Sequence, residues 1–99
     1  MEPFNASWDG DILRLNGELD LAEASAFEEG VRARLDGQDP LIVDVSRLTF
    51  IDSTGIRALV NIVRAAAPRR VVVRDAPPNV RRVLELTSIT SVVPNVTLD

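Results

Sequence analysis

The sequence predicts a single α/β domain over residues 1–99, with helices packed on a mixed β-sheet in the order β-β-α-β-α-β-α-β. Segments with strand-like and helix-like spacing of apolar residues alternate along the chain. The pair Asp9-Gly10 separates the first two strand-like segments and is typical of a type I′ hairpin turn. The nearly continuous apolar run from Leu41 to Val45 is typical of a central strand covered on both faces.

The hairpin comprises residues 4–8 and 11–15, and residues 16–20 then break the strand pattern. Asp20 can cap the helix that follows, which the spacing predicts from Leu21 to about Leu35. Gly37 suits the end of this helix. Its predicted inward residues are Leu21, Ala24, Phe27, Val31 and Leu35.

After the strand at 41–45, residues 46–51 are expected to form a loop. The block Asp52-Ser53-Thr54-Gly55 leads into a second helix that ends near Ala67, because Pro68 cannot continue it. The predicted inward stripe of this helix is Ile56, Leu59, Val60 and Val63.

The remaining elements are a β-branched strand over 70–74, a third helix that opens at 77–79, and a short last strand at about 92–93. This pattern contains no internal repeat or linker, so it is one compact unit. Parallel strands joined by helices account for the order of these elements.

The composition excludes most kinds of catalytic site. All eleven basic residues are arginine, and the chain has no His, Cys, Tyr or Lys. Catalytic triads and typical zinc sites need His or Cys, whereas a phosphate-binding P-loop or a Schiff base needs Lys. We therefore expect a protein that is not an enzyme and holds no metal and no cofactor.

The net charge and the hydropathy of the chain limit the kinds of partner that it can bind. The net charge is −4 and the pI about 4.7, whereas direct nucleic-acid binding generally requires a basic patch. Apolar runs are far shorter than the ~20 residues of a membrane span, and residues 1–4 lack the features of a signal peptide. We expect a cytoplasmic protein that inserts into no membrane and binds other proteins.

The candidate site lies between Asp44 and Gly55, where a strand end meets a helix start. Asp52, Ser53 and Thr54 compete for the capping position, which alone could explain them. Gly55 lowers helix propensity by ~1 kcal/mol, so a close contact or a contact surface is expected there. A phosphate on a hydroxyl here would be favoured by the helix dipole and opposed by Asp52.

Two further sets of residues leave alternatives open. Arg57, Asn61 and Arg64 face outward from the same helix, either as a solvated face or as a partner-docking face. Asp20, Asp44 and Asp52 could converge on Mg²⁺, but solvated carboxylates and helix caps explain them more simply. A receiver-type phospho-acceptor site would also need the missing lysine.

The residues carry a resemblance to a known family. The stretch Asp44-Val45-Ser46-Arg47-Leu48-Thr49-Phe50-Ile51-Asp52-Ser53-Thr54-Gly55-Ile56 resembles the signature of STAS domains, the family of anti-sigma factor antagonists. Residues 16–20 resemble the turn before the family's first helix, and residues 77–87 resemble the start of its third helix. The resemblance thus covers most of the chain in the right order.

The resemblance implies a function as well as a fold. Antagonists of this kind bind an anti-sigma factor, often a serine kinase, and so release a sigma factor. It implies that Ser53 is phosphorylated, which ends the binding until a phosphatase reverses it, with Thr54 as the second candidate. The partner-binding residues would be Asp52, Ser53, Thr54, Gly55, Arg57, Asn61 and Arg64.

The resemblance also leaves an alternative and one departure. The alternative is a stand-alone STAS subunit of a membrane transporter or signalling assembly that has no phospho-switch. The departure is that relatives usually carry a further helix after the last strand, which is expected to be missing or truncated here because residues 94–99 follow that strand.

Overall fold

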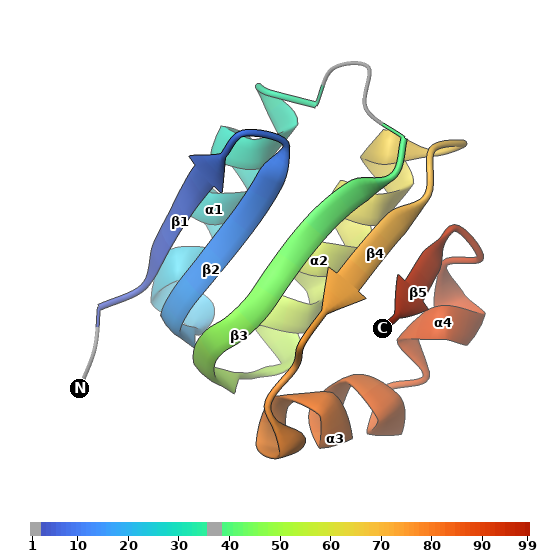
Figure 1. Ribbon diagram of the computed structural model, residues 1–99. Helices are drawn as coiled ribbons and strands as arrows, with labels where there is room; N and C mark the ends of the chain where they lie inside the picture. The colour runs from blue at the N-terminus through green and yellow to red at the C-terminus, as the bar shows by residue number, and fades with distance from the viewer. Residues whose placement is uncertain (1–2, 36–38) are drawn as a thin grey trace.

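The computed structural model describes residues 3–35 and 39–99. It contains a five-stranded sheet in the spatial order β1-β2-β3-β4-β5, in which β1 runs antiparallel to β2 and the other neighbours are parallel (Figure 1). The mixed α/β architecture predicted from the sequence is therefore confirmed. The elements are β1 Asn5–Asp9, β2 Ile12–Leu19, α1 Leu21–Arg32, β3 Leu41–Ile51, α2 Ser53–Ala66, β4 Val71–Arg74, α3 Pro78–Leu86, α4 Ile89–Val92 and β5 Val96–Leu98.

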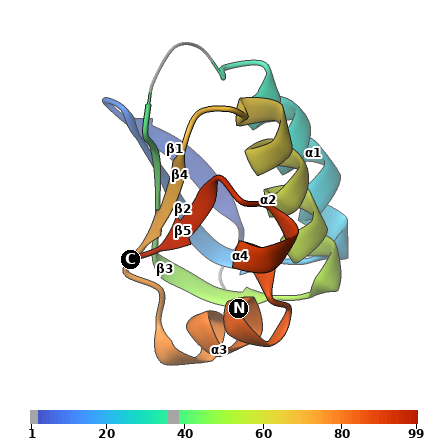
Figure 2. The same cartoon turned by 90° about the vertical axis from the view of Figure 1, so that its right-hand side faces the viewer.

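The helices divide the molecule into layers. α1 and α2 lie side by side on one face of the sheet, α4 lies on the same side next to β5, and α3 lies across the carboxyl end of the strands (Figure 2). The opposite face carries no helix among the described residues. The core fills the space between the sheet and α1 and α2, and α2 contributes most to it. Its buried residues are Gly55, Ile56, Ala58, Leu59, Val60, Ile62, Val63 and Ala66.

The strands β2 and β3 are longer than the sequence predicts. Residues 16–19, expected to break the pattern, and residues 46–51, expected to be a loop, continue these strands and pair with each other. The register shifts between Arg14 and Asn16 and again between Gly17 and Glu18. Because such irregularities interrupt the two-residue alternation of side chains, the sequence pattern hides the continuing strand.

The end of the chain also differs from the prediction. Residues 92 and 93, expected as a strand, belong to the end of α4, and the last strand is β5. Ile89 and Val93, four residues apart, are both buried, so packing of one helical turn overrides the β-branched composition. The described chain contains no helix after β5.

Smaller corrections concern turns and helix ends. Gly10, with φ of 59°, and Asp11 form the two-residue turn between β1 and β2. Because Asp11 has no positive φ, the turn is not of type I′. α1 ends at Arg32 rather than near Leu35, and Gly37 lies outside the described residues. Among the described helices, none has the length and apolar content needed to cross a bilayer.

Candidate partner-binding site at the start of α2

The starts of α1, α2 and α3 gather at the carboxyl edge of the parallel strands (Figure 1). β2 ends at Leu19 and β3 at Ile51, which are paired with each other, so the two helices that follow begin next to each other. The Asp52 amide donates to the Leu19 carbonyl at 3.3 Å. The Asn79 side chain at the start of α3 donates to the Thr49 carbonyl at 2.9 Å. These two hydrogen bonds hold the starts of α2 and α3 against the ends of β2 and β3, where the predicted site lies.

Asp52 takes the capping position for which three residues competed in the sequence. Its Oδ1 accepts hydrogen bonds from the Thr54 and Gly55 amides, both at 3.0 Å, and from the Thr54 hydroxyl at 2.6 Å. The Thr54 hydroxyl, together with the amides of Gly55, Thr54 and Leu21, holds the pKa of Asp52 below its ordinary value despite partial burial. The carboxylate therefore lies at the N-termini of both α1 and α2.

The two hydroxyl groups of the site have different environments. Thr54 is half-buried and its hydroxyl is bonded to Asp52. Ser53 is the first residue of α2 and is exposed. Ser53 is therefore the more accessible of the two residues, and the hydroxyl of Thr54 is already engaged.

Gly55 is buried and faces the interior of the molecule. A Cβ atom at this position would lie 2.7 Å from the Leu19 carbonyl oxygen and 2.8 Å from Cγ1 of Ile51. The close approach that the sequence predicted is therefore made by the chain's own β2. Gly55 is buried, and its assignment to a surface for a partner stays a prediction.

The three residues of α2 that were predicted to face outward differ in their exposure. Arg57 and Arg64 are exposed, and at 3.6 residues per turn they lie within about 40° of Ser53 around the helix axis. Asn61 is half-buried, and its Nδ2 donates to Oε1 of Glu28 in α1 at 3.0 Å. Asn61 therefore joins the two helices and is not a freely solvated side chain, and its role in docking a partner stays a prediction.

One exposed apolar residue at this edge was not predicted. Leu21, assigned to the inward stripe of α1, is 75% exposed, and its amide lies beside the Asp52 carboxylate. Leu21 directly follows the capping residue Asp20 and opens the helix, a position that the apolar spacing does not distinguish from the buried ones. We call Leu21, Ser53, Arg57 and Arg64 the α2 surface.

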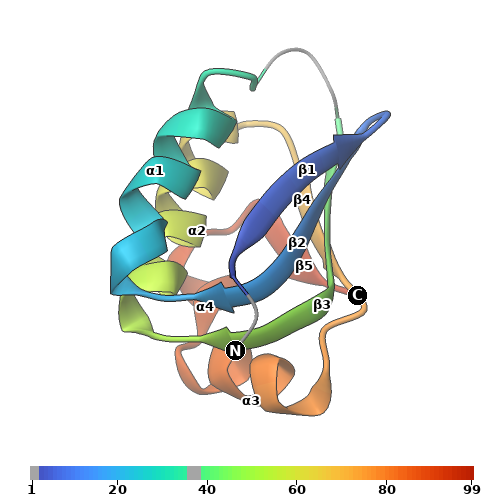
Figure 3. The ribbon, with the colours of Figure 1, turned by 90° about the vertical axis from the view of Figure 1, so that its left-hand side faces the viewer.

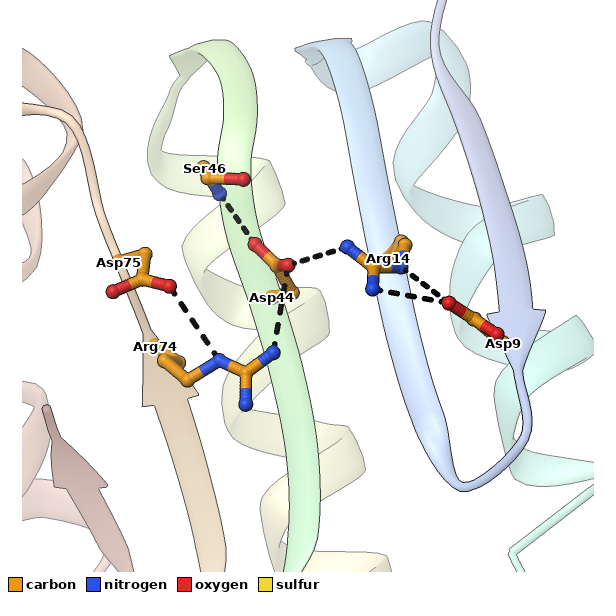
Figure 4. A network of polar contacts seen from close by, with 6 residues as sticks. All are labelled: Asp9, Arg14, Asp44, Ser46, Arg74 and Asp75. Atoms are coloured by element: carbon orange, nitrogen blue, oxygen red, sulfur yellow. Dashed lines mark hydrogen bonds and ion pairs between the residues drawn. The ribbon is translucent and has the colours of Figure 1, made fainter.

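Asp44 lies on the sheet face without helices and belongs to a different cluster (Figure 4). It is 5% exposed, and its Oδ2 lies 2.9 Å from Nη1 of Arg14 and 3.7 Å from Nη2 of Arg74. Burial raises its pKa, but the hydrogen bonds from Ser46 and the charges of the two arginines outweigh it and hold the pKa below its ordinary value.

The carboxylates of Asp20, Asp44 and Asp52 thus serve different purposes. Asp20 accepts from the Ala22 amide at 3.1 Å and caps α1, Asp52 caps α2, and Asp44 is bound by arginines. No group of three metal-ligating side chains occurs in residues 3–35 and 39–99. The helix-cap interpretation explains Asp20 and Asp52, and ion pairs explain Asp44.

The chain is similar in sequence to known proteins. A family model described as "Mlab, STAS domain" matches residues 4–94. The chain belongs to the STAS-domain family. A curated relative from Bordetella bronchiseptica, named "Putative anti-sigma factor antagonist BtrV", is 28% identical over 86 residues, which cover 84% of this chain and 74% of the relative. The resemblance predicted from the Asp44–Ile56 stretch is confirmed.

Solved STAS structures agree with this fold. The unphosphorylated anti-sigma factor antagonist SpoIIAA has a TM-score of 0.75 at 20% identity, covering 98% of this chain and 88% of its own. A "putative anti-sigma factor antagonist" from Thermotoga maritima has a TM-score of 0.75 at 25% identity, covering 97% and 86%. The phosphorylated form of SpoIIAA, the Bacillus cell fate determinant, is also similar, with a TM-score of 0.68 at 19% identity, covering 98% and 91%.

STAS domains of another kind share the fold as well. The STAS domain of a SulP transporter from Vibrio cholerae has a TM-score of 0.59 at 21% identity, covering 94% of this chain and 77% of its own. At this identity the likeness concerns the fold alone. The fold of this chain is therefore anti-sigma factor antagonist-like, within a family that also includes transporter domains.

Proposed function

We propose that this STAS protein is an anti-sigma factor antagonist that acts in the cytoplasm, binds an anti-sigma factor through the α2 surface, and is regulated by phosphorylation of Ser53. The observation that carries the proposal is the selective exposure of Ser53 within the block Asp52–Gly55. Asp52 caps the helix, the Thr54 hydroxyl is bonded to it, and Gly55 is buried. Ser53 is the member of the block that a partner and a kinase can both reach.

The charges of the α2 surface support a partner whose binding would be weakened by a negative charge on Ser53. Arg57 and Arg64 are exposed, and neither forms an ion pair with a carboxylate within the described residues. Leu21, at the start of α1 near Asp52, adds an exposed apolar side chain to this surface. A partner that presents carboxylates to these arginines would be repelled by a phosphate on Ser53, and an unpaired charge buried on binding is costly. A phosphate would thus end the interaction.

In this scheme the chain itself performs no catalysis. The anti-sigma factor is a serine kinase that transfers the γ-phosphoryl group of ATP to the Ser53 hydroxyl oxygen, and a phosphatase removes it by hydrolysis. The STAS protein supplies an accessible hydroxyl and a rigid helix start. The carboxylates of Asp20, Asp44 and Asp52 are engaged in capping and ion pairs, which suits a binding module.

The phosphorylation proposal is tested with purified proteins. The chain is incubated with the anti-sigma factor of its own organism and ATP, and intact mass and peptide fragmentation are measured. We expect one added phosphate on Ser53 and none on the Ser53→Ala variant. A phosphate mapped to Thr54 or Ser46 would move the site, and ATP hydrolysis by the chain alone would contradict the absence of catalysis.

A stand-alone STAS subunit of a transporter or signalling assembly is the second candidate, since the SulP domain shares this fold. Such a subunit would bind its partner equally well as the wild type, as the Ser53→Ala variant or as the phosphomimetic Ser53→Glu variant. A pull-down with wild-type and Ser53→Glu protein separates the two candidates. Recovery of a transporter component by both forms would favour the subunit.

A further inference from the structure

β1 is an edge strand whose outer side faces away from the rest of the sheet. It pairs with β2 alone, in a regular five-residue register from Asn5↔Asn16 to Asp9↔Ile12 (Figure 3). Natural edge strands are commonly protected by proline, lysine, a bulge or very short length. β1 has no proline or lysine, and its register is uninterrupted. By contrast, β5 at the other edge has three residues.

The turn determines which backbone groups point outward from β1. Asp9 and Ile12 flank the two-residue turn and form a hydrogen-bonded pair. In an antiparallel ladder, hydrogen-bonded and non-bonded pairs alternate, so Ser7 and Asn5 also bond to β2. The amides and carbonyls of Ala6 and Trp8 consequently point to the free edge, where a further strand can pair with them.

We propose that a second copy of this chain occupies this edge, with the two β1 strands antiparallel and related by a two-fold axis at Ser7. This register alone lets Ala6 and Trp8 of each copy exchange their outward hydrogen bonds with Trp8 and Ala6 of the other. The result is one continuous ten-stranded sheet made of two five-stranded sheets. The strand is self-complementary in this register on both faces.

On the face covered by helices, the register places a large residue opposite a small one. Trp8 of each copy lies directly opposite Ala6 of the other. Next to them, a groove of about 310 Å³ opens between β1 and α1, lined by Ala6, Ala26 and Gly30 together with aromatic residues. Apart from its chain neighbours and the backbone of its own helix, a Cβ on Gly30 would meet no atom within 4 Å, so space remains for the edge of a partner's ring.

On the open face, the register avoids pairing like charges. Asn5 of each copy lies opposite Asp9 of the other, so an amide faces a carboxylate that is already bound by Arg14 at 3.0 Å. Ser7 faces Ser7 across the axis, where opposite Cβ atoms are about 4.5–5.5 Å apart. α1 lies between the β1 edge and α2, so such a dimer leaves Ser53, Arg57 and Arg64 on α2 free and does not depend on the proposed function.

Sedimentation velocity over a concentration series tests this dimer. We expect the mass to rise with concentration from 10.8 kDa towards twice that value. Ser7→Lys places two ammonium groups at the axis and should leave the protein monomeric. Thr97→Lys, an exposed residue on the open face at the other edge, is the matched control and should dimerise like the wild type.

A second pair of variants tests the register. Asn5→Lys creates two ion pairs with Asp9 of the other copy and should lower the dissociation constant about tenfold, whereas Asn5→Asp sets like charges opposite and should raise it. Thermal melts confirm that each variant is folded. A wild type that stays monomeric throughout, or a dimer that Ser7→Lys and Thr97→Lys affect equally, would overturn the proposal.

Discussion

Asp52 satisfies two free amides at the start of α2 with one carboxylate oxygen. Replacing it by Ala removes both bonds and should lower the free energy of unfolding by about 1–2 kcal/mol, the usual cost of losing a helix cap. Asp52→Asn keeps an oxygen acceptor, so it should lower the free energy of unfolding by less than Asp52→Ala does. Urea unfolding followed by circular dichroism measures both variants. Equal stability of Asp52→Ala and the wild type would contradict this role.

The acid dependence of this cap follows from its pKa. Because the pKa of Asp52 is lower in the fold than its ordinary value of 3.8, the carboxylate stabilises the fold above that value. The contribution is lost as the pH falls through the folded-state pKa. Unfolding curves of the wild type and Asp52→Ala should therefore differ at pH 7 and draw together in acid.

Gly55 and Gly30 offer a matched pair of helix glycines. Gly55→Ala would place its Cβ 2.7 Å from the Leu19 carbonyl, so overpacking should lower the stability by about 1–3 kcal/mol in spite of better helix propensity. Gly30→Ala adds a Cβ that meets no atom within 4 Å apart from its chain neighbours and the backbone of its own helix, so the stability should rise by up to about 1 kcal/mol. Thermal melts at low protein concentration measure both. Stabilisation by both substitutions would show that Gly55 is not needed for packing.

At the scale of elements, Asp44 links three strands, since Arg14 lies on β2 and Arg74 on β4. Asp44→Asn leaves two arginines without their shared carboxylate and should cost about 1–3 kcal/mol at pH 7. Because the pKa of Asp44 is lowered in the fold, this difference should shrink as the pH falls below about 4. Asp75→Asn removes an exposed partner of Arg74 and is the control, with an expected change under ~0.5 kcal/mol.

Phosphorylation of Ser53 should leave α2 folded. The helix dipole favours a phosphate by about 0.3–1 kcal/mol, and repulsion from Asp52 opposes it by a similar amount. Eight buried residues hold α2 on the sheet, and each large one contributes about 1.5–3 kcal/mol, so packing dominates. Circular dichroism and melting of both forms should agree within ~1 kcal/mol. Loss of helical signal in the phosphorylated form would indicate order–disorder switching instead.

A comparison of the elements shows which features of the fold and the site can be predicted from the sequence. α2 was predictable because its buried stripe is long and regular, and the cap Asp52 was among three named candidates. The extension of β2 and β3 was not predictable, because the register shifts interrupt the alternation of inward and outward side chains along these strands. The sequence assigns Gly55 and Asn61 to a partner surface, but it cannot show that Leu19 and Glu28 lie against them. Only tertiary contacts decide such roles.

For the whole molecule, the central claim is that a charge on Ser53 ends binding to an anti-sigma factor. Titration calorimetry with the anti-sigma factor of the same organism tests it most directly, with Ser91→Glu, an exposed serine on α4, as the control. Wild type, Ser53→Ala and Ser91→Glu should bind alike, whereas Ser53→Glu and the phosphorylated protein should bind at least about tenfold more weakly, equivalent to about 1.4 kcal/mol. Equal affinity of Ser53→Glu and Ser53→Ala, or of the phosphorylated and unphosphorylated protein, would contradict the account.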